Sequence, residues 1–198
     1  MPVIKQTALF SLLLTASALT TATEPPSAPP PFKSGQESAQ FCRHCHGEAG
    51  ISAHPDTPNL AGQNAAYLLD QMNKFAAGQR KSEFMEGLIK ALKPEERANI
   101  ALYFSQQKVQ PQPARNSAQT EAGGKLYAKL CVYCHGANAY GSDNIPRLAS
   151  QQTVYLQLSL KRYRNGSGER IDPRMQSYTR NLKDQDIDNL AAYLASLR

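Results

Sequence analysis

The architecture of this chain follows from two short motifs, CRHCH at residues 42–46 and CVYCH at residues 131–135. Each holds two cysteines separated by two residues and followed directly by a histidine. The copies lie 89 residues apart and use all 4 cysteines of the 198-residue chain. A repeat of this period in a chain of this length indicates two similar small domains in tandem.

The repeat extends well beyond the two cysteine motifs. Pro-Asn-Leu-Ala-Gly-Gln at 58–63 recurs as Pro-Arg-Leu-Ala-Ser-Gln at 146–151. The apolar residues Leu68, Met72 and Phe75 stand at i, i+4 and i+7, and the second copy repeats this stripe. Such spacing places them on one face of a helix, and no segment alternates like a strand. The sequence therefore predicts an all-α fold, with these stripes facing two separate cores.

The cysteine motif has a specific chemical meaning. Two thiols separated by two residues can add to the two vinyl groups of one haem, and the following histidine can then ligate the iron. A redox dithiol and half of a zinc site are the alternatives for a CxxC pair. Two copies in a matched repeat favour haem. The predicted covalent attachment residues are Cys42, Cys45, Cys131 and Cys134, and the predicted proximal ligands are His46 and His135.

The second axial ligand follows from the few candidates in each half. Beyond Ala118 the chain has one methionine, Met175, which is the ordinary distal ligand available there. In the first half the candidates are Met72, Met85 and His54. Met85 follows its proximal histidine by 39 residues, and Met175 follows its own by 40. We therefore predict Met85 as the first-half ligand, with Met72 a core residue and His54 a loop residue.

Two prolines mark a supporting position. Pro58 and Pro146 stand 12 and 11 residues beyond the proximal histidines. A backbone carbonyl at this position could accept the imidazole proton and hold the ring, as metal-bound histidine commonly requires. The alternative is that both are simple turn prolines.

The chain begins like an exported protein. Lys5 precedes an apolar run, Ala8 to Leu19, which is too short to span a bilayer and resembles a secretory signal. We expect export to the periplasm and no transmembrane anchor in the mature form. The predicted segments are a signal peptide at 1–23, a Pro-rich tether at 24–32, a haem domain at 33–108, a linker at 109–117 and a second haem domain at 118–198.

These motifs together resemble the cytochrome c4 family. The resemblance rests on the two CxxCH motifs, the Pro-x-Leu-Ala-x-Gln segments, Met85 with Met175, and the closing helices with Tyr103 and Tyr193. It implies two tandem class I cytochrome c domains related by pseudo-twofold symmetry, with the haems facing each other across the interface. It also implies two covalently bound haem c groups, His/Met ligation at both, and periplasmic electron transfer, often toward a terminal oxidase.

The expected function is therefore electron transfer rather than catalysis, because two protein ligands are predicted for each iron. A haem c subunit of a dehydrogenase complex, such as a flavocytochrome, is the alternative. A di-haem peroxidase is disfavoured by the chain length and by the methionine at each haem. The expected partners are redox proteins, either a membrane-bound oxidase or a dehydrogenase, and nucleic acid is not expected.

Charge differs between the halves. Residues 33–108 hold nine basic and eight acidic side chains, whereas residues 115–198 hold twelve and seven. Five basic residues could surround the second haem edge and steer an acidic partner, although a solvated helix face is the simpler alternative. They are Lys161, Arg162, Arg164, Arg170 and Arg174. We also expect the domains to pack against each other, with their haem propionate edges toward the interface.

Overall fold

The computed structural model describes residues 31–112 and 117–198. The predicted signal peptide, most of the predicted tether and the centre of the predicted linker lie outside these ranges. The described residues form helices and no β-strand, which confirms the all-α prediction. The helices are α1 (Pro31–Ser38), α2 (Gln40–His46), α3 (Ala65–Ala76), α4 (Glu83–Lys90), α5 (Pro94–Ser105), α6 (Ser117–Leu130), α7 (Val132–His135), α8 (Thr153–Asn165), α9 (Pro173–Thr179) and α10 (Asp184–Ser196). None of these helices is long and apolar enough to cross a bilayer.

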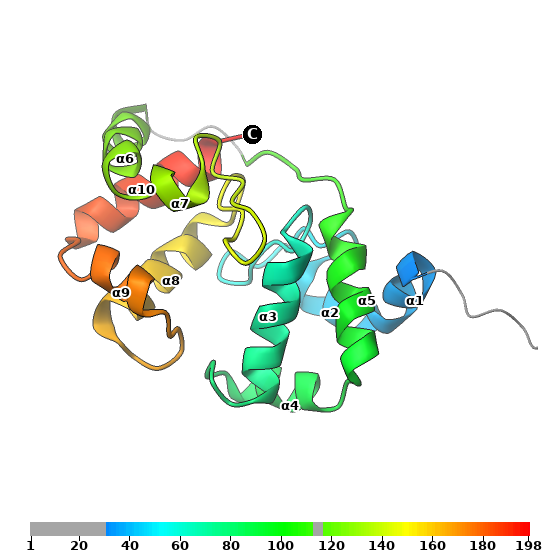
Figure 1. The fold of residues 1–198 in the computed structure, drawn as a ribbon. Coiled ribbons are helices and arrows are strands. Elements are labelled where there is room, and N and C mark those ends of the chain that lie inside the picture. The colour runs from blue at the N-terminus through cyan, green and yellow to red at the C-terminus, as the bar shows by residue number, and fades with distance from the viewer. Residues whose placement is uncertain (1–30, 113–116) are drawn as a thin grey trace, which may run out of the picture.

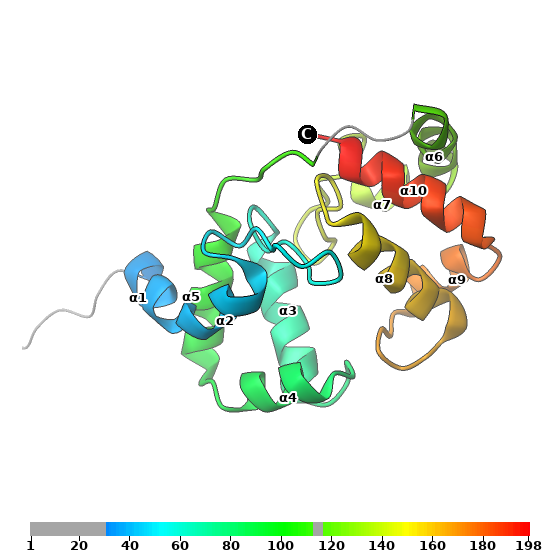
Figure 2. The same ribbon diagram turned by 180° about the vertical axis from the view of Figure 1, so that it is seen from behind.

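The sequence repeat is also a repeat in space. Helices α1 to α5 form one half and α6 to α10 form the other, and the two halves lie side by side (Figures 1 and 2). Each half encloses its own core of buried apolar side chains. Leu68, Met72 and Phe75 belong to the first core, so the predicted apolar face of α3 is confirmed. In the second half Leu156 is buried and Leu160 packs beside it.

In each half the first and last helices cross closely at a glycine. A Cβ atom on Gly35 of α1 would lie 2.2 Å from the backbone oxygen of Asn99 in α5. On Gly123 of α6 it would lie 2.0 Å from the backbone oxygen of Asn189 in α10. Only glycine permits such an approach of two helix backbones. The crossing packs each closing helix against the helix that leads into its CxxCH motif.

The closing helices also begin in the same way. The backbone N–H of Lys93 donates to Glu96 Oε2 (2.8 Å) at the start of α5. The backbone N–H of Lys183 donates to Asp186 Oδ2 (2.9 Å) at the start of α10. A carboxylate in the first turn satisfies a free donor and opposes the positive end of the helix dipole. Matched local sequences therefore start matched helices.

The loop after α2 packs against the loop after α7, which joins the two halves (Figure 1). The backbone N–H of Tyr155 donates to the carbonyl of Pro55 (3.0 Å), and Asn64 Nδ2 donates to the carbonyl of Ile145 (2.6 Å). Gln152 Nε2 donates to the carbonyl of Ser52 (2.6 Å). The expected contact between the domains is thus present, and it is largely polar.

Candidate functional site

Helix α2 and the short helix α7 present the two cysteine motifs. All four thiols are free; Cys42 and Cys131 are half-buried, while Cys45 and Cys134 are exposed. Burial raises the pKa of the Cys42 and Cys131 thiols to about 11. A redox dithiol requires the opposite shift, toward thiolate. The surroundings of these cysteines therefore disfavour the dithiol alternative.

Each motif histidine is buried and held by a backbone carbonyl. His46 Nδ1 lies 2.8 Å from the carbonyl oxygen of Pro58, and His135 Nδ1 lies 3.1 Å from that of Pro146. Burial lowers the pKa of both imidazoles, which favours their neutral forms. A neutral ring that donates from Nδ1 keeps the lone pair of Nε2 free for a metal.

The two methionines occupy equivalent positions in equivalent helices. Met85 is the third residue of α4, and its backbone N–H donates to Ser82 Oγ (3.5 Å). Met175 is the third residue of α9, and its backbone N–H donates to Asp172 Oδ1 (3.2 Å). In both halves an N-cap side chain therefore anchors the backbone of the methionine.

The other candidates of the first half lie elsewhere. Met72 is 9% exposed within the first core, although it also borders the cavity described below. His54 is exposed and does not line that cavity, and its backbone N–H donates a hydrogen bond to Ser52 Oγ (3.0 Å). His44, the other histidine of the first motif, is exposed on α2, whereas His46 is buried.

A continuous cavity of about 870 Å³ passes through both halves. Apolar core side chains form much of its wall, including Leu68 and Leu156. The residues predicted to bind haem all line it: Cys42, Cys45, His46 and Met85 from the first half, and Cys131, Cys134, His135 and Met175 from the second. The structure thus brings together each predicted set of attachment and axial residues, and it joins the two sets in one cavity.

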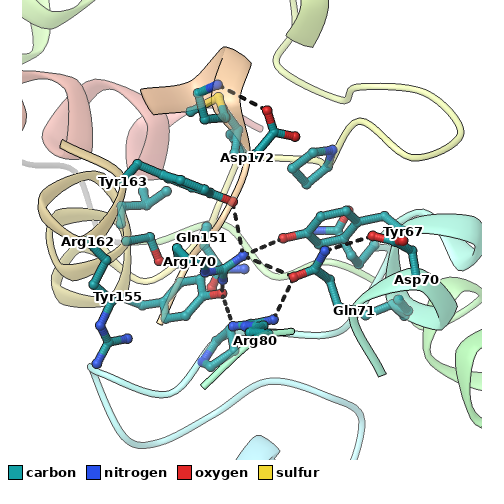
Figure 3. A pocket seen from close by; sticks show the side chains of 18 of the residues that line it. Tyr67, Asp70, Gln71, Arg80, Gln151, Tyr155, Arg162, Tyr163, Arg170 and Asp172 are labelled. Atoms are coloured by element: carbon teal, nitrogen blue, oxygen red, sulfur yellow. Dashed lines mark hydrogen bonds between the residues drawn. The ribbon is translucent and has the colours of Figure 1, made fainter. Parts of the chain in front are cut away.

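Two arginines meet where the cavity crosses from one half to the other (Figure 3). Arg170 is 4% exposed, and its guanidinium donates to Tyr67 Oη (2.8 Å), Gln71 Oε1 (3.4 Å), Tyr163 Oη (3.5 Å) and Tyr155 Oη. Arg80 donates to Gln71 Oε1 (2.9 Å) and Tyr155 Oη (3.4 Å). We call these six residues the arginine cluster. It draws on both halves.

The arginine cluster is rich in positive charge and lacks a carboxylate partner among the described ion pairs. Burial and the neighbouring Arg80 lower the pKa of Arg170 to about 10, so Arg170 is still a cation at neutral pH. Its Nε atom is buried without a hydrogen-bond partner. Buried charges are normally paired, so this site suits an anionic group.

The donor set fits haem c in each half. The thiols stand at i and i+3 of each motif, the neutral imidazole faces an apolar cavity, and the methionine lines the same space. The arginine cluster offers cations that would suit the carboxylates of a haem. Thioether attachment, axial ligation and propionate binding therefore each have matching residues on this chain.

The expectation for Arg170 as a steering residue is wrong. Its side chain is buried between the halves and cannot face a partner, because burying it there satisfies its donors with Tyr67 and Gln71. The other four members of the predicted basic ring are ion-paired. Lys161 and Arg164 contact Asp184, Arg162 contacts Glu169, and Arg174 contacts Asp172.

The sequence prediction missed Tyr67, Gln71, Tyr155 and Tyr163 as members of the site. Tyr67 and Tyr155 each stand four residues after the repeated glutamine, so the repeat itself carried a signal for them. No motif pointed to Gln71, because the second half has Ser159 at the matching position. Residues that contact each other only across the interface produce little recognisable pattern in the sequence of either half.

Comparison with known proteins identifies relatives along most of the chain. The family model described as Cytochrome c matches residues 120–198. Cytochrome c4 of Pseudomonas aeruginosa is 34% identical over 174 residues, which cover 82% of this chain and 87% of that protein. The thiosulfate dehydrogenase electron acceptor of Thiomonas intermedia is 29% identical over 184 residues, covering 86% of this chain and 84% of that protein.

A solved structure shares the arrangement of the helices. The crystal structure of reduced recombinant cytochrome c4 from Pseudomonas stutzeri superposes with a TM-score of 0.78 at 31% identity. The match covers 84% of this chain and 98% of that one. The similarity therefore extends over both halves and the way in which they are joined.

Proposed function

This chain belongs to the cytochrome c4 family of electron-transfer proteins, and we propose that it is a periplasmic di-haem carrier that passes single electrons to a terminal oxidase. The observation that carries the proposal is the continuous cavity that both CxxCH motifs, both buried histidines and both equivalent methionines line. A chain with one site would not need two matched donor sets in one space.

We assign the haem sites residue by residue. Thioethers form at Cys42 and Cys45 in the first half and at Cys131 and Cys134 in the second. The axial ligands are His46 with Met85, and His135 with Met175. The matched N-cap bonds at the two methionines support the choice of Met85 over Met72, because Met85 alone has the local setting of Met175.

Pro58 and Pro146 act by holding the proximal rings. Each carbonyl accepts a hydrogen bond from a buried Nδ1–H, which fixes the ring orientation and the tautomer that leaves Nε2 for the iron. A bound haem supplies the one-electron couple of its iron. The protein supplies two strong-field ligands, an apolar enclosure that excludes water, and cations at the domain interface.

The arginine cluster gives the two haems a common boundary. We propose that Arg80 and Arg170 bind propionates there, which neutralises their positive charge and places both haem edges at the interface. A short separation of the edges favours transfer between the irons. The exposed cysteines Cys45 and Cys134 then mark the opposite, outward edges, where partners dock.

The domain boundaries follow from the same repeat. We propose haem domains at 33–108 and 118–198, a linker at 109–117, a tether at 24–32 and a cleaved signal peptide at 1–23. Helix α1 begins at Pro31, so the last residues of the proposed tether already belong to the first helix. Export places haem attachment and partner docking outside the cytoplasm.

Intact mass and visible spectroscopy of the purified protein test the haem assignment. We expect the mass of the chain from its new N-terminus plus two haems, and a Met-to-ferric charge-transfer band from both irons. A gain of one haem, or none, would overturn the proposal.

A dehydrogenase partner is the second candidate, favoured by the similarity to the thiosulfate dehydrogenase electron acceptor. The reduced protein should be oxidised by membranes that contain a terminal oxidase if the first candidate is right. Rapid reduction by a thiosulfate dehydrogenase with its substrate, without oxidation by such membranes, would favour the second.

A further inference from the structure

The interface between the halves contains a reciprocal pair of glutamines, Gln63 and Gln151. Gln151 Oε1 accepts from the backbone N–H of Asn59 (2.7 Å), and its Nε2 donates to the carbonyl of the same residue (2.9 Å). Gln63 does the same to Arg147, with distances of 2.7 Å and 2.9 Å. Each glutamine therefore clamps one backbone residue of the opposite domain.

The clamped residue directly follows the proline that holds the proximal histidine. The peptide unit between Pro58 and Asn59 thus makes two hydrogen bonds: its carbonyl accepts from His46 Nδ1, and its N–H donates to Gln151. A chain of hydrogen bonds runs from the histidine of one domain, through a single peptide unit, to the glutamine of the other. His135, Pro146 and Gln63 form the mirror image.

Burial and local bonding make both chains well defined. Gln63, Gln151 and Asn59 are each 6% exposed. Gln151 Oε1 also accepts from the backbone N–H of Gln152 (2.9 Å), and Gln63 Oε1 accepts from that of Asn64 (3.0 Å). Two N–H donors at each Oε1 fix which way the amide points, since a reversed amide would face its own N–H groups toward donors.

Hydrogen bonds in series polarise one another in a low-dielectric interior, by roughly 10–30% per bond. An acceptor on the peptide N–H makes the peptide carbonyl a stronger acceptor. A stronger acceptor at Nδ1–H gives the imidazole more imidazolate character, so its Nε2 is a better donor to ferric iron. A ferric iron stabilised in this way has a lower midpoint potential.

We propose that Gln63 and Gln151 are positioning residues that act in a crossed manner, each on the haem of the opposite domain. Gln151 lowers the midpoint potential of the N-terminal haem, and Gln63 lowers that of the C-terminal haem. The inference rests on the proposed function, because it takes His46 and His135 as the axial ligands. Its consequence is that each iron senses the docked state of the opposite domain. Separation of the domains would raise both potentials.

The test is redox titration of the di-haem protein carrying Gln151→Leu or Gln63→Leu, with each potential assigned by NMR of the haem methyl signals. Gln151→Leu should raise the potential of the N-terminal haem and leave the C-terminal value unchanged. Gln63→Leu should do the reverse. The Nδ1–H resonance of the histidine in the affected domain should also move upfield, as its hydrogen bond weakens.

Matched controls lie one residue further along. Gln152→Leu removes the bonds to the carbonyl of Ser52 and to Asn59 Oδ1, and Asn64→Leu removes those to the carbonyls of Ile145 and Tyr140. Both variants therefore disturb the same interface and leave the clamped backbone N–H groups with their glutamine partners. Neither should produce the crossed shift. Gln151→Glu keeps an oxygen acceptor for Asn59 and should leave the N-terminal potential at or below the wild-type value, which provides a test even if the leucine variant folds poorly.

The outcomes separate this inference from the proposed function. Wild-type protein without two His/Met spectra would overturn the ligand assignment. Wild-type protein with both spectra, and a Gln151→Leu variant that shifts its own haem, both haems together, or neither, would overturn the crossed clamp alone. A shift of equal size in Gln152→Leu would also overturn it, because general loosening of the interface would then be the cause.

Discussion

The two halves of this cytochrome agree at their proposed ligand positions and differ where they meet. Both have the histidine and carbonyl pair, the methionine in the first turn of a helix, and the glycine at the helix crossing. In the arginine cluster, however, Gln71 faces both arginines, whereas its counterpart Ser159 has a buried hydroxyl without a hydrogen-bond partner. The repeated residues give both halves the same proposed haem ligands. The residues that differ between the halves give each haem site its own electrostatic surroundings.

The two arginines show the same asymmetry. Arg170 is buried and lies against the rings of Tyr155 and Tyr163, with centroid distances of 5.4 and 5.7 Å. Arg80 is half-buried and stacks on Phe75 at 4.3 Å. Phe75 and Tyr163 occupy matching positions, so the tyrosine ring beside Arg170 carries a hydroxyl group that the matching ring beside Arg80 lacks. Two haems in this fold are therefore expected to have different potentials, although their proposed ligands are the same.

The largest expected effects come from the proposed axial methionines, where the halves should behave alike. Met85→Ala and Met175→Ala should each remove the charge-transfer band of one haem and lower the potential of that haem, because methionine ligation raises it. The haem should stay attached through its thioethers. Spectra and redox titration of both variants measure these changes.

Met72→Ala is the control for the first half. Met72 lies in the core, so its truncation should cost roughly 2–5 kcal/mol of stability and leave both bands in place. A band lost in Met72→Ala and kept in Met85→Ala would show that the halves use methionines from different helices.

The helix crossings provide the next largest effect. Gly35→Ala and Gly123→Ala would each drive a Cβ atom into a backbone oxygen, at 2.2 and 2.0 Å. We expect a loss of roughly 1–3 kcal/mol in the free energy of unfolding of the affected half, since a helix backbone must move. Urea unfolding of the di-haem protein, followed by the charge-transfer band of each haem, measures this loss.

Gly87→Ala is the matched control for the crossings. Gly87 lies in α4, and a Cβ atom there meets nothing within 4 Å. The substitution should raise the free energy of unfolding by up to about 1 kcal/mol, through better helix propensity. An equal loss in the free energy of unfolding for Gly87→Ala and Gly35→Ala would mean that the close helix crossing does not cause the destabilisation.

The features that could be predicted from the sequence are those that occur in both copies of the repeat. The helices, the two cores and the pairing of Met85 with Met175 could all be predicted, because each depends on local spacing that occurs twice. The arginine cluster could not, because Arg80 and Arg170 come together only across the interface. Arg170 was expected at the surface since an arginine beside exposed basic residues has no local signal for burial.

The glutamines lie between these two cases. Gln63 and Gln151 ended a visible repeated segment, so their importance could be suspected, but their contacts run to the opposite domain. A sequence repeat shows that a residue type occurs at the same position in both domains, but it does not show which residues each copy contacts. Only the docked structure connects each glutamine to the peptide unit of the other histidine.

The arginine cluster should show a moderate and unequal effect. Arg170→Leu and Arg80→Leu both remove a positive charge at the interface, which favours the ferric state and lowers the potential of the nearby haem. The fall should be larger for Arg170, because it is more deeply buried and has more partners in the cluster. Redox titration of the two variants measures the difference, and equal shifts would contradict the asymmetry.

The smallest expected effect concerns the outer edges, where the halves differ in charge. Lys129 is exposed two residues before Cys131, and the matching residue before Cys42 is the exposed Gln40. Because four of the predicted steering residues are ion-paired and Arg170 is buried, any remaining attraction depends on exposed cations such as this lysine.

Lys129→Gln and Gln40→Glu lower the net charge by the same amount at matched positions. If electrons leave by the more basic half, only Lys129→Gln should slow oxidation by the anionic reagent ferricyanide at low ionic strength, and salt should remove the difference. Stopped-flow rates across a range of salt concentrations measure both effects. The exchanged variant, Gln40→Lys with Lys129→Gln, should recover the rate if position is immaterial and stay slow if exit occurs at the C-terminal edge. Equal slowing by the two single variants would show that the reagent senses net charge alone, and the functional distinction between the two edges would then fail.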